Sequence, residues 1–390
     1  MYASNLAHNF LWSRLEVFVI HSRISENGLP SADCHTAMPP VSVLVNTYNH
    51  ERFIAQALSS VAEQAFPSTE IETIVVDDGS TDATPEIVKR FLPDVQYIRK
   101  SNGGQVSALH EGVAHCSGDI IAFLDGDDWW TKDKISTVMN FFNKYPSIAA
   151  VGHGFYEADE QGSVRRAVVL DSEYHLSFET AAAARFAASV RTFGGTSKLA
   201  MRRQTLDRAL PIPTELPFFD NFLFFQAIAT AGAILLPQAL CYYRLHGGNL
   251  YASDVRNEDR LRRKYNLELG LVKHLPGRLA SIGVSTEIIS AVLESDRIDS
   301  DRLRLSLDGG KPWNTFRVEN AHFRSFYRDP NLGYRIFKYF VLLLTLSMPP
   351  KIFYQLRHWY SERNLRRIRE RIVRAPVANP EVVRHTGTKS

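Results

Sequence analysis

The stretch DIIAFLDGDDWW, residues 119–130, decides the fold. Its apolar residues 120–124 have the length of a buried strand, and three carboxylates, Asp125, Asp127 and Asp128, follow at once. In open α/β sheets, ligands bind beyond the carboxyl ends of the strands. Crowded carboxylates repel one another unless a cation lies between them, and Mg²⁺ and Mn²⁺ prefer such oxygen ligands. The stretch is therefore either a divalent-cation site or a solvated acidic turn.

The segments before this stretch alternate between strand and helix patterns. Apolar strands are predicted at residues 41–45, 71–76, 95–98 and 120–124. After the first strand, apolar residues recur at helical spacing as far as Ala65. After the second strand, Pro85 and Glu86 suit the first turn of another helix. This order predicts an α/β fold with a mostly parallel sheet flanked by helices. The loops NTYN, DDGS and DGDD would then meet at one edge of the sheet.

Composition excludes several classes of protein. The chain has 390 residues and a net charge of +3, which is too small to indicate a nucleic-acid partner. Its cysteines, Cys34, Cys116 and Cys241, share no metal-binding spacing and predict reduced residues in the cytoplasm. Residues 10–20 are apolar but are interrupted by charges and lack a cleavage site, which argues against a signal peptide and a spanning helix.

Eight segments in order carry a resemblance to a known family. They are VSVLVNTYN, IVVDDGSTDAT, NGGQVSALHEGVAHCSGD, FLDGDDWW, GGTSKLAMRRQTL, LPIP, FFDNFL and YYRLHGGN. Together they resemble a family 2 glycosyltransferase with the nucleotide-sugar-binding GT-A fold, over about residues 40–250. The resemblance implies a nucleoside-diphosphate-sugar donor and a divalent metal, Mn²⁺ or Mg²⁺, as cofactor.

The resemblance also implies where the donor binds. Asp78 would hold the nucleobase, because a carboxylate accepts from a ring N–H. The residues around the first strand, Asn46, Thr47 and Tyr48, would contact base and ribose, although many relatives have Pro in place of Asn46; Asn49 and His50 read as a plain turn. Backbone N–H groups at a helix start suit a phosphate or a sugar hydroxyl, and this loop contains Asn102 and Gly104.

Metal ligands and a general base follow from the same resemblance. Asp125 would contact ribose or metal, Asp127 would ligate the metal, and His246 would reach the metal or the diphosphate; the alternative for His246 is a surface histidine with ordinary partners. Asp220 would deprotonate the acceptor hydroxyl, and its alternative role is a helix N-cap. Phe219 stands where relatives carry a further acid, so Asp220 is the one carboxylate left for this task.

The predicted organisation has five parts. Residues 1–38 are an N-terminal extension, 39–255 the GT-A domain (39–130 for the donor, 131–255 for acceptor and catalysis), 256–330 a helical region, 331–375 amphipathic helices and 376–390 a disordered tail. Arginines crowd residues 363–374, and basic amphipathic helices lie on anionic membranes. The alternative is a helical hairpin packed on the body. We expect a cytoplasmic protein held peripherally at the membrane.

Three functions fit these patterns. The first is an inverting glycosyltransferase acting on a glycan or lipid-linked acceptor. The second is a catalytically silent nucleotide-sugar-binding or scaffold protein at the membrane, which the Phe219 replacement favours. The third is a nucleotide-sugar hydrolase that uses water as acceptor. Retention of the acidic DGDD turn and of Asp220 favours the first.

Overall fold

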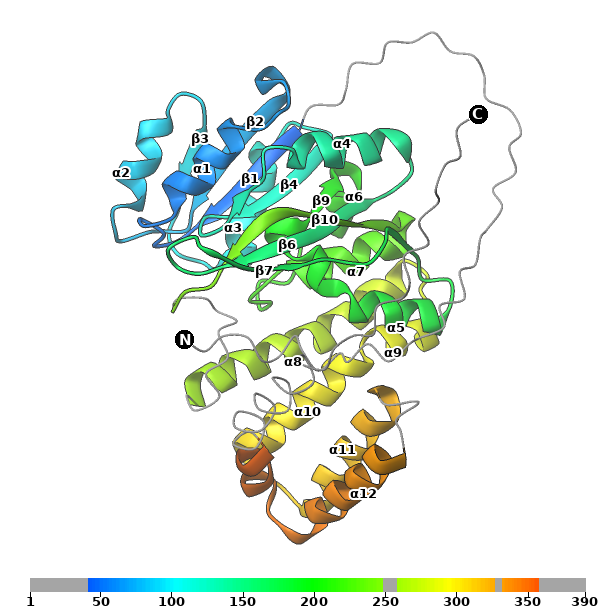
Figure 1. Cartoon of the computed structure of the whole chain (residues 1–390). Helices are drawn as coiled ribbons and strands as arrows, with labels where there is room; N and C mark the ends of the chain where they lie inside the picture. The colour runs from blue at the N-terminus through cyan, green and yellow to red at the C-terminus, as the bar shows by residue number, and fades with distance from the viewer. Residues whose placement is uncertain (1–40, 248–257, 327–331, 358–390) are drawn as a thin grey trace, which may run out of the picture. The chain divides into compact units, whose positions relative to one another are not determined.

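A ten-stranded sheet organises the first part of the protein (Figure 1). The computed structural model describes residues 41–247, 258–326 and 332–357. Contacts divide the chain into two units, Met1–Ser300 and Asp301–Ser390. The predicted N-terminal extension, the arginine-rich stretch and the tail lie outside the described residues.

The strands of the sheet follow the order β3-β2-β1-β4-β9-β6-β10-β5, with β7 beside β6 and β8 beside β10. The strands are β1 Val41–Thr47, β2 Ile71–Asp77, β3 Gln96–Arg99, β4 Ile120–Asp125, β5 Trp129–Trp130, β6 Ala150–Ala158, β7 Val164–Val168, β8 Tyr174–Leu176, β9 Ala200–Arg202 and β10 Ala233–Arg244. The first four strands are parallel, and β9 runs antiparallel to both of its neighbours. The predicted α/β fold is confirmed, and the four predicted strands are β1 to β4.

Helices cover both faces of the sheet. One face carries α1 Ile54–Ala62, α2 Thr84–Val88 and α4 Lys134–Lys144. The other carries α3 Gln105–His115, α5 Ala181–Ser189, α6 Arg203–Ala209, α7 Asp220–Ala231, α8 Glu258–Ser281 and α9 Thr286–Val292. Successive strand residues point to opposite faces, so Val43 and Val45 of β1 enter the first core while Leu44 enters the second.

The register of the parallel strands brings the polar loops together. Thr47 lies opposite Asp77, and Asn46 lies opposite Asp125, so β1, β2 and β4 end side by side. The loops NTYN, DDGS and DGDD therefore start from neighbouring points on one edge, as predicted from their order. This edge is where ligands bind in open α/β sheets.

The second unit is helical in its described part. Its helices are the end of α10 (Glu294–Asp308), α11 Pro312–Phe326, α12 Leu332–Ser347 and a helical segment at residues 350–357. Leu305, Phe353 and Tyr354 form its small core. Among the residues with a described structure, no helix is long and apolar enough to cross a membrane.

The helical region was expected to start at residue 256, and α8 begins at Glu258. Helices α8 and α9 contribute Leu271, Leu275 and Val292 to the core on one face of the sheet. The contact boundary accordingly falls after Ser300. The function of each predicted part stays a prediction.

Candidate active site

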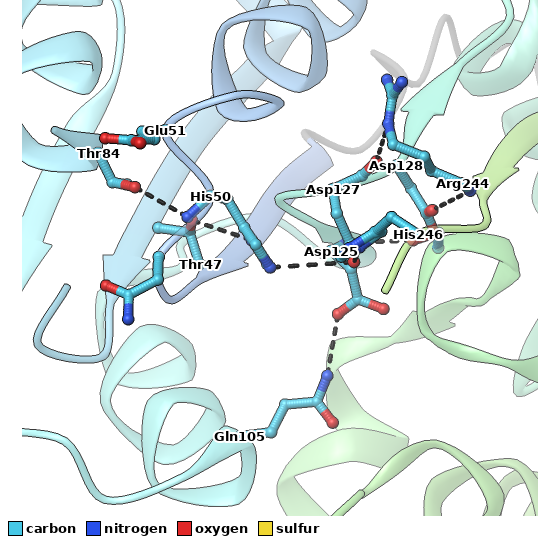
Figure 2. Close-up of polar contacts among 12 residues, drawn as sticks. Thr47, His50, Glu51, Thr84, Gln105, Asp125, Asp127, Asp128, Arg244 and His246 are labelled. Atoms are coloured by element: carbon cyan, nitrogen blue, oxygen red, sulfur yellow. Dashed lines mark hydrogen bonds and ion pairs between the residues drawn. The ribbon is translucent and has the colours of Figure 1, made fainter. Parts of the chain in front are cut away.

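Figure 2 shows the acidic turn after β4 with side chains that contact it, and two backbone hydrogen bonds also hold the turn in place. Oxygen atoms of Asp125, Asp127 and Asp128 all lie within 4.8 Å of one another. The backbone N–H of Gly126 donates to the carbonyl of Asn46 at 2.9 Å, which ties the turn to β1. The backbone N–H of Asp125 donates to Ser197 Oγ at 3.1 Å, so the segment before β9 supports the turn as well.

The electrostatics of this turn favour a cation. Burial raises the pKa of the Asp125 carboxyl well above its usual range, and the charges of Asp127 and Asp128 raise it further. Burial and the Asp127 charge raise the pKa of Asp128 to about 7. Burial also acts to raise the pKa of Asp127, but His50 and His246 together hold it below its ordinary value. A divalent cation removes this mutual repulsion, so the residues present fit a metal ion.

Two imidazoles approach the same carboxylate oxygen. His246 Nε2 lies 2.9 Å from Asp127 Oδ2, and His50 Nε2 lies 3.9 Å from it. The structure thus brings His246 to the acidic turn, where the resemblance placed it. It also brings His50 there, a residue that the sequence analysis assigned to a plain turn.

Arg244 at the end of β10 and Trp129 of β5 support the turn. The backbone N–H of Arg244 donates to Asp128 Oδ1 at 2.9 Å, and its Nε donates to the carbonyl of Asp127 at 2.8 Å. The guanidinium lies 4.3 Å from the Trp129 ring centre, and Trp129 stacks on Tyr242 at 4.7 Å. Trp130 is buried in the core, and its indole N–H donates to the carbonyl of Ser197.

Asp78 directly follows β2 and contacts the loop at residues 100–104. Its carboxylate accepts from Lys100 Nζ at 2.8 Å and from the backbone N–H groups of Gly103 at 2.9 Å and Gly104 at 2.7 Å. These N–H groups were expected to face a phosphate or a sugar hydroxyl, and here they fix the loop to Asp78 instead. Asn102 is exposed beside them. The roles of Asp78, Asn102 and Gly104 at a donor stay predictions.

Near the end of β1 lie the exposed ring of Tyr48 and the buried amide of Asn46. Tyr48 is 44% exposed, which leaves its ring accessible for stacking. The Thr47 hydroxyl lies 3.3 Å from His50 Nδ1. Asn46 Oδ1 and Gln105 Oε1 are buried and have no hydrogen-bond partner among the described residues. Buried acceptors of this kind are ordinarily satisfied, so a ligand hydroxyl or N–H fits both.

Gln105 was missed by the sequence analysis although it stands in the quoted NGGQ segment. Its Nε2 donates to Asp125 Oδ1 at 2.9 Å from the first turn of α3. The contact joins residues 20 positions apart, and no local pattern predicts it.

Asp220 occupies a half-buried position at the start of α7. It is the first helical residue after the N-cap Phe219, and its Oδ1 accepts from the neighbouring N–H of Asn221 at 2.7 Å. The alternative role of helix N-cap therefore does not fit. Burial raises the pKa of its carboxyl, while Asn221, Lys198 and Arg191 act in the opposite direction.

A cavity opens beside Asp220. Its walls are Leu216, Phe218, Asp220, Asn221, Leu267, Glu268 and Leu271. Phe219 points elsewhere: its side chain is fully buried and its ring lies 5.6 Å from that of Phe123. The position where relatives carry a further acid is thus part of the core here.

Lys198 is a further residue that the sequence analysis did not single out. It is 8% exposed, and its ammonium lies 4.6 Å from the Phe155 ring centre and 5.2 Å from that of Tyr243. Its positive charge acts to lower the pKa of Asp125, Asp128 and Asp220. In the sequence, the one signal for a functional Lys198 is that a charged residue stands directly before apolar residues in the segment GGTSKLA.

The fold and this site agree with comparisons to known proteins. Residues 42–210 match the family described as "Glycosyl transferase family 2". The matched segment contains the acidic turn, so this part of the chain is similar to a family 2 glycosyltransferase.

Relatives with printed activities align with only part of their length. An uncharacterized glycosyltransferase of Nostoc sp. is 28% identical over 242 residues, 59% of this chain and 72% of that protein. The poly(ribitol-phosphate) beta-N-acetylglucosaminyltransferase TarS of Staphylococcus aureus is 34% identical over 114 residues, 28% of this chain and 20% of TarS. The crystal structure of S. aureus TarS 1-349 in complex with UDP-GlcNAc has a TM-score of 0.51 and 21% identity, covering 72% of this chain and 79% of that one, which shows a shared fold.

Proposed function

We propose that the protein is an inverting, divalent-metal-dependent transferase that moves a sugar from a nucleoside-diphosphate sugar to a hydroxyl of a glycan or lipid-linked saccharide. One observation carries this proposal. The acidic turn Asp125–Asp127 lies at the edge of the sheet where the parallel strands end, and a separate half-buried carboxylate, Asp220, lies beside a cavity. A direct displacement needs a base that is distinct from the group holding the leaving diphosphate.

The donor would lie across the ends of β1, β2 and β4. The exposed Tyr48 ring is available to stack on the base, near Asp78 and Thr47. The unpaired oxygens of Asn46 and Gln105 would accept hydrogen bonds from the ribose or the sugar. This arrangement supports a donor with both a nucleobase and hydroxyl groups.

Asp125, Asp127 and His246 would hold the metal ion. Carboxylate oxygens and imidazole nitrogens suit Mn²⁺, and carboxylate oxygens suit Mg²⁺. When bound, the ion neutralises the negative charge that develops on the leaving diphosphate. Arg244 and Gln105 keep the turn in place by hydrogen bonds to Asp128 and Asp125.

Asp220 would take the proton of the acceptor hydroxyl. The raised pKa of its buried carboxyl makes it a stronger base than an exposed aspartate. The cavity beside it combines apolar walls from Leu216 and Leu271 with the carboxyl of Glu268.

The first experiment measures turnover with UDP-, GDP- and dTDP-sugars, Mn²⁺ and a panel of saccharide acceptors. Wild-type protein should release nucleoside diphosphate and form a new glycoside, and Asp220→Asn should do neither at a comparable rate. Equal release without acceptor, with free sugar as product, would favour a hydrolase. Binding of a donor with no turnover by wild type would favour the silent scaffold, which the buried Phe219 supports.

The second unit would hold the enzyme at a membrane surface. Six apolar side chains of α12 are more than a third exposed: Ile336, Tyr339, Phe340, Leu343, Leu344 and Leu346. Leu342 and Thr345 on the same helix are buried, so the exposed residues form one face. An exposed apolar face of this size supports contact with lipid, and a peripheral cytoplasmic location stays a prediction.

A further inference from the structure

We propose that His50 is a second imidazole ligand of the divalent cation, so that the metal site combines aspartate oxygens with nitrogens from His50 and His246. The inference rests on the metal-dependent function proposed above. It adds a residue from the first loop, at the end of β1, to a site that otherwise comes from β4 and the end of β10.

The position of the His50 ring supports this role. Its Nε2 lies 3.9 Å from Asp127 Oδ2, which is too long for a hydrogen bond. His246 Nε2 lies 2.9 Å from the same oxygen, and Figure 2 shows both rings linked to Asp127. His50 Nε2 faces the acidic turn. It forms no hydrogen bond with any of the described residues, so it is available to bind an ion.

The rest of His50 is fixed in place. Its backbone N–H donates to Thr84 Oγ1 at 2.9 Å, and its carbonyl accepts from the N–H groups of Phe53 and Ile54, both at 2.9 Å. On the ring, Nδ1 lies 3.3 Å from the Thr47 hydroxyl. Metal-binding histidines characteristically have their other ring nitrogen held in this way, because the partner sets the orientation of the ring.

Gly126 allows the turn to lie against this ring. A Cβ at Gly126 would lie 2.7 Å from Thr47 Oγ1 and 2.8 Å from His50 Nδ1, closer than real Cβ contacts. The glycine between Asp125 and Asp127 therefore accommodates the Thr47–His50 pair. The pair and the acidic turn form one packed unit.

Nitrogen ligands change which metal is preferred. Mg²⁺ prefers oxygen ligands, whereas imidazole binds transition metals more tightly. A site with two imidazoles is therefore expected to prefer Mn²⁺ over Mg²⁺. Loss of His50 should reduce this preference as well as the affinity.

The test compares two substitutions of His50 that distinguish the contribution of Nδ1 from that of Nε2. His50→Asn retains an amide near the position of Nδ1, which can still bond Thr47, and lacks any atom at the position of Nε2. His50→Gln reaches toward the position of Nε2 with a weaker ligand. The control is His115→Gln, because His115 lies at the end of α3 against Glu111 and Gln96, on the far end of that helix from Gln105.

Mn²⁺ binding to the full chain is measured by the loss of the free-ion electron paramagnetic resonance signal, with and without UDP or GDP, and Mg²⁺ by competition. We expect His50→Asn to weaken Mn²⁺ roughly 10–100-fold, the range typical for groups that support a metal site. His50→Gln should weaken it less, and His115→Gln should match wild type. Urea midpoints check that each variant is folded.

Each other outcome has a definite meaning. Unchanged Mn²⁺ affinity in both His50 variants, with binding abolished in Asp127→Asn, overturns the inference and leaves the proposed function standing. Unchanged affinity for Mn²⁺ alone with weaker nucleotide binding shows that His50 contacts the diphosphate, which also overturns it. A wild-type protein that binds no Mn²⁺ under any condition overturns both.

Discussion

At the scale of single residues, desolvation of the Asp220 carboxyl raises its pKa, which makes it a stronger base and lowers the stability of the fold when it is ionised. Its carboxyl lies in a cavity wall and accepts a hydrogen bond, and burial raises its pKa. A group whose pKa is higher in the folded state binds its proton more tightly there. The stabilisation that comes from protonated Asp220 is fully present below the pKa of the unfolded state. It is lost as the pH rises through the pKa of the folded state. At neutral pH the ionised carboxylate therefore destabilises the fold.

Asp220→Asn should separate activity from stability. Transfer should fall roughly 10²–10⁴-fold, the usual contribution of a general base. Nucleoside-diphosphate binding should remain, and the urea midpoint at pH 7 should rise because the buried charge is gone. Asp207→Asn is the control, since the Asp207 side chain is 52% exposed on α6. A variant that loses donor binding together with activity would contradict the assignment of Asp220 to the acceptor side.

Whether a site residue could be predicted from the sequence depends on how far away in the chain its contact partners lie. Asp125, Asp127 and His246 could be predicted because they stand in recognisable segments. His50, Gln105 and Lys198 could not, because their contacts are set by the fold: His50 meets Asp127 only when β1 and β4 pair. The same fold fixed Gly103 and Gly104 on Asp78, which the loop sequence did not indicate.

At the scale of elements, α3 lies close to the sheet through Gly112. A Cβ at this glycine would lie 2.2 Å from Leu44 Cδ1 and 2.9 Å from Val76 Cγ2. Both neighbours are fully buried, so neither can move away at low cost. The helix can approach β1 and β2 this closely only with glycine at this position.

Gly112→Ala should destabilise the protein. Overpacking of a core costs roughly 1–3 kcal/mol, which exceeds the gain of about 1 kcal/mol in helix propensity. Gly277→Ala in α8 is the matched control, because no atom lies within 4 Å of its built Cβ. Urea midpoints of the two variants should move in opposite directions. Equal effects at both positions would show that backbone entropy, and not packing, decides the result.

The exposed face of α12 predicts lipid binding. Phe340 is 60% and Leu343 is 63% exposed, and burying both in a bilayer interface is favourable. Phe340→Asp with Leu343→Asp should reduce sedimentation of the full chain with anionic vesicles. Val164→Asp is the control, since Val164 on β7 is 53% exposed. Unchanged vesicle binding by the α12 variant would contradict membrane contact through this helix.

Elements were predicted well where the pattern is local. The four parallel strands β1 to β4 could be read from short apolar runs, whereas strands β5 to β9 were not predicted. Of these, β6 pairs parallel with β10 and antiparallel with β7 and β9. Helix α1 ends at Ala62 and not at Ala65 as expected, because the Ala65 N–H donates to the carbonyl of Lys132 at 2.7 Å. A contact across the fold, absent from any local pattern, sets that boundary.

At the scale of the whole molecule, the second unit has its own buried charge network. Glu319 accepts from Arg302 at 2.9 and 2.8 Å, from Arg357 at 2.5 Å and from the Tyr354 hydroxyl at 3.2 Å. Burial alone would raise the pKa of Glu319, but Arg357 and Arg302 lower it to about 2. A lowered pKa contributes stability above the unfolded value of 4.5, and this stability is lost as the pH falls toward about 2.

Glu319→Gln should therefore loosen the second unit and leave the first unchanged. Removing one partner of a buried ion pair costs roughly 3–5 kcal/mol. Hydrogen exchange at pH 7 should become faster in α11 and stay the same in β4. Asp301→Asn is the control, because the Asp301 side chain is 53% exposed. Equal acceleration in β4 would show that the two units unfold together.

The central claim is that the acidic turn after β4 binds a nucleoside-diphosphate donor through a divalent ion. The most direct test is calorimetric titration of the full chain with UDP, GDP, dTDP and CMP, each with Mn²⁺ and with chelator, using wild type and Asp127→Ala. We predict that one nucleoside diphosphate binds, that binding requires the metal, and that Asp127→Ala abolishes it. No binding of any nucleotide by folded wild-type protein would contradict the claim.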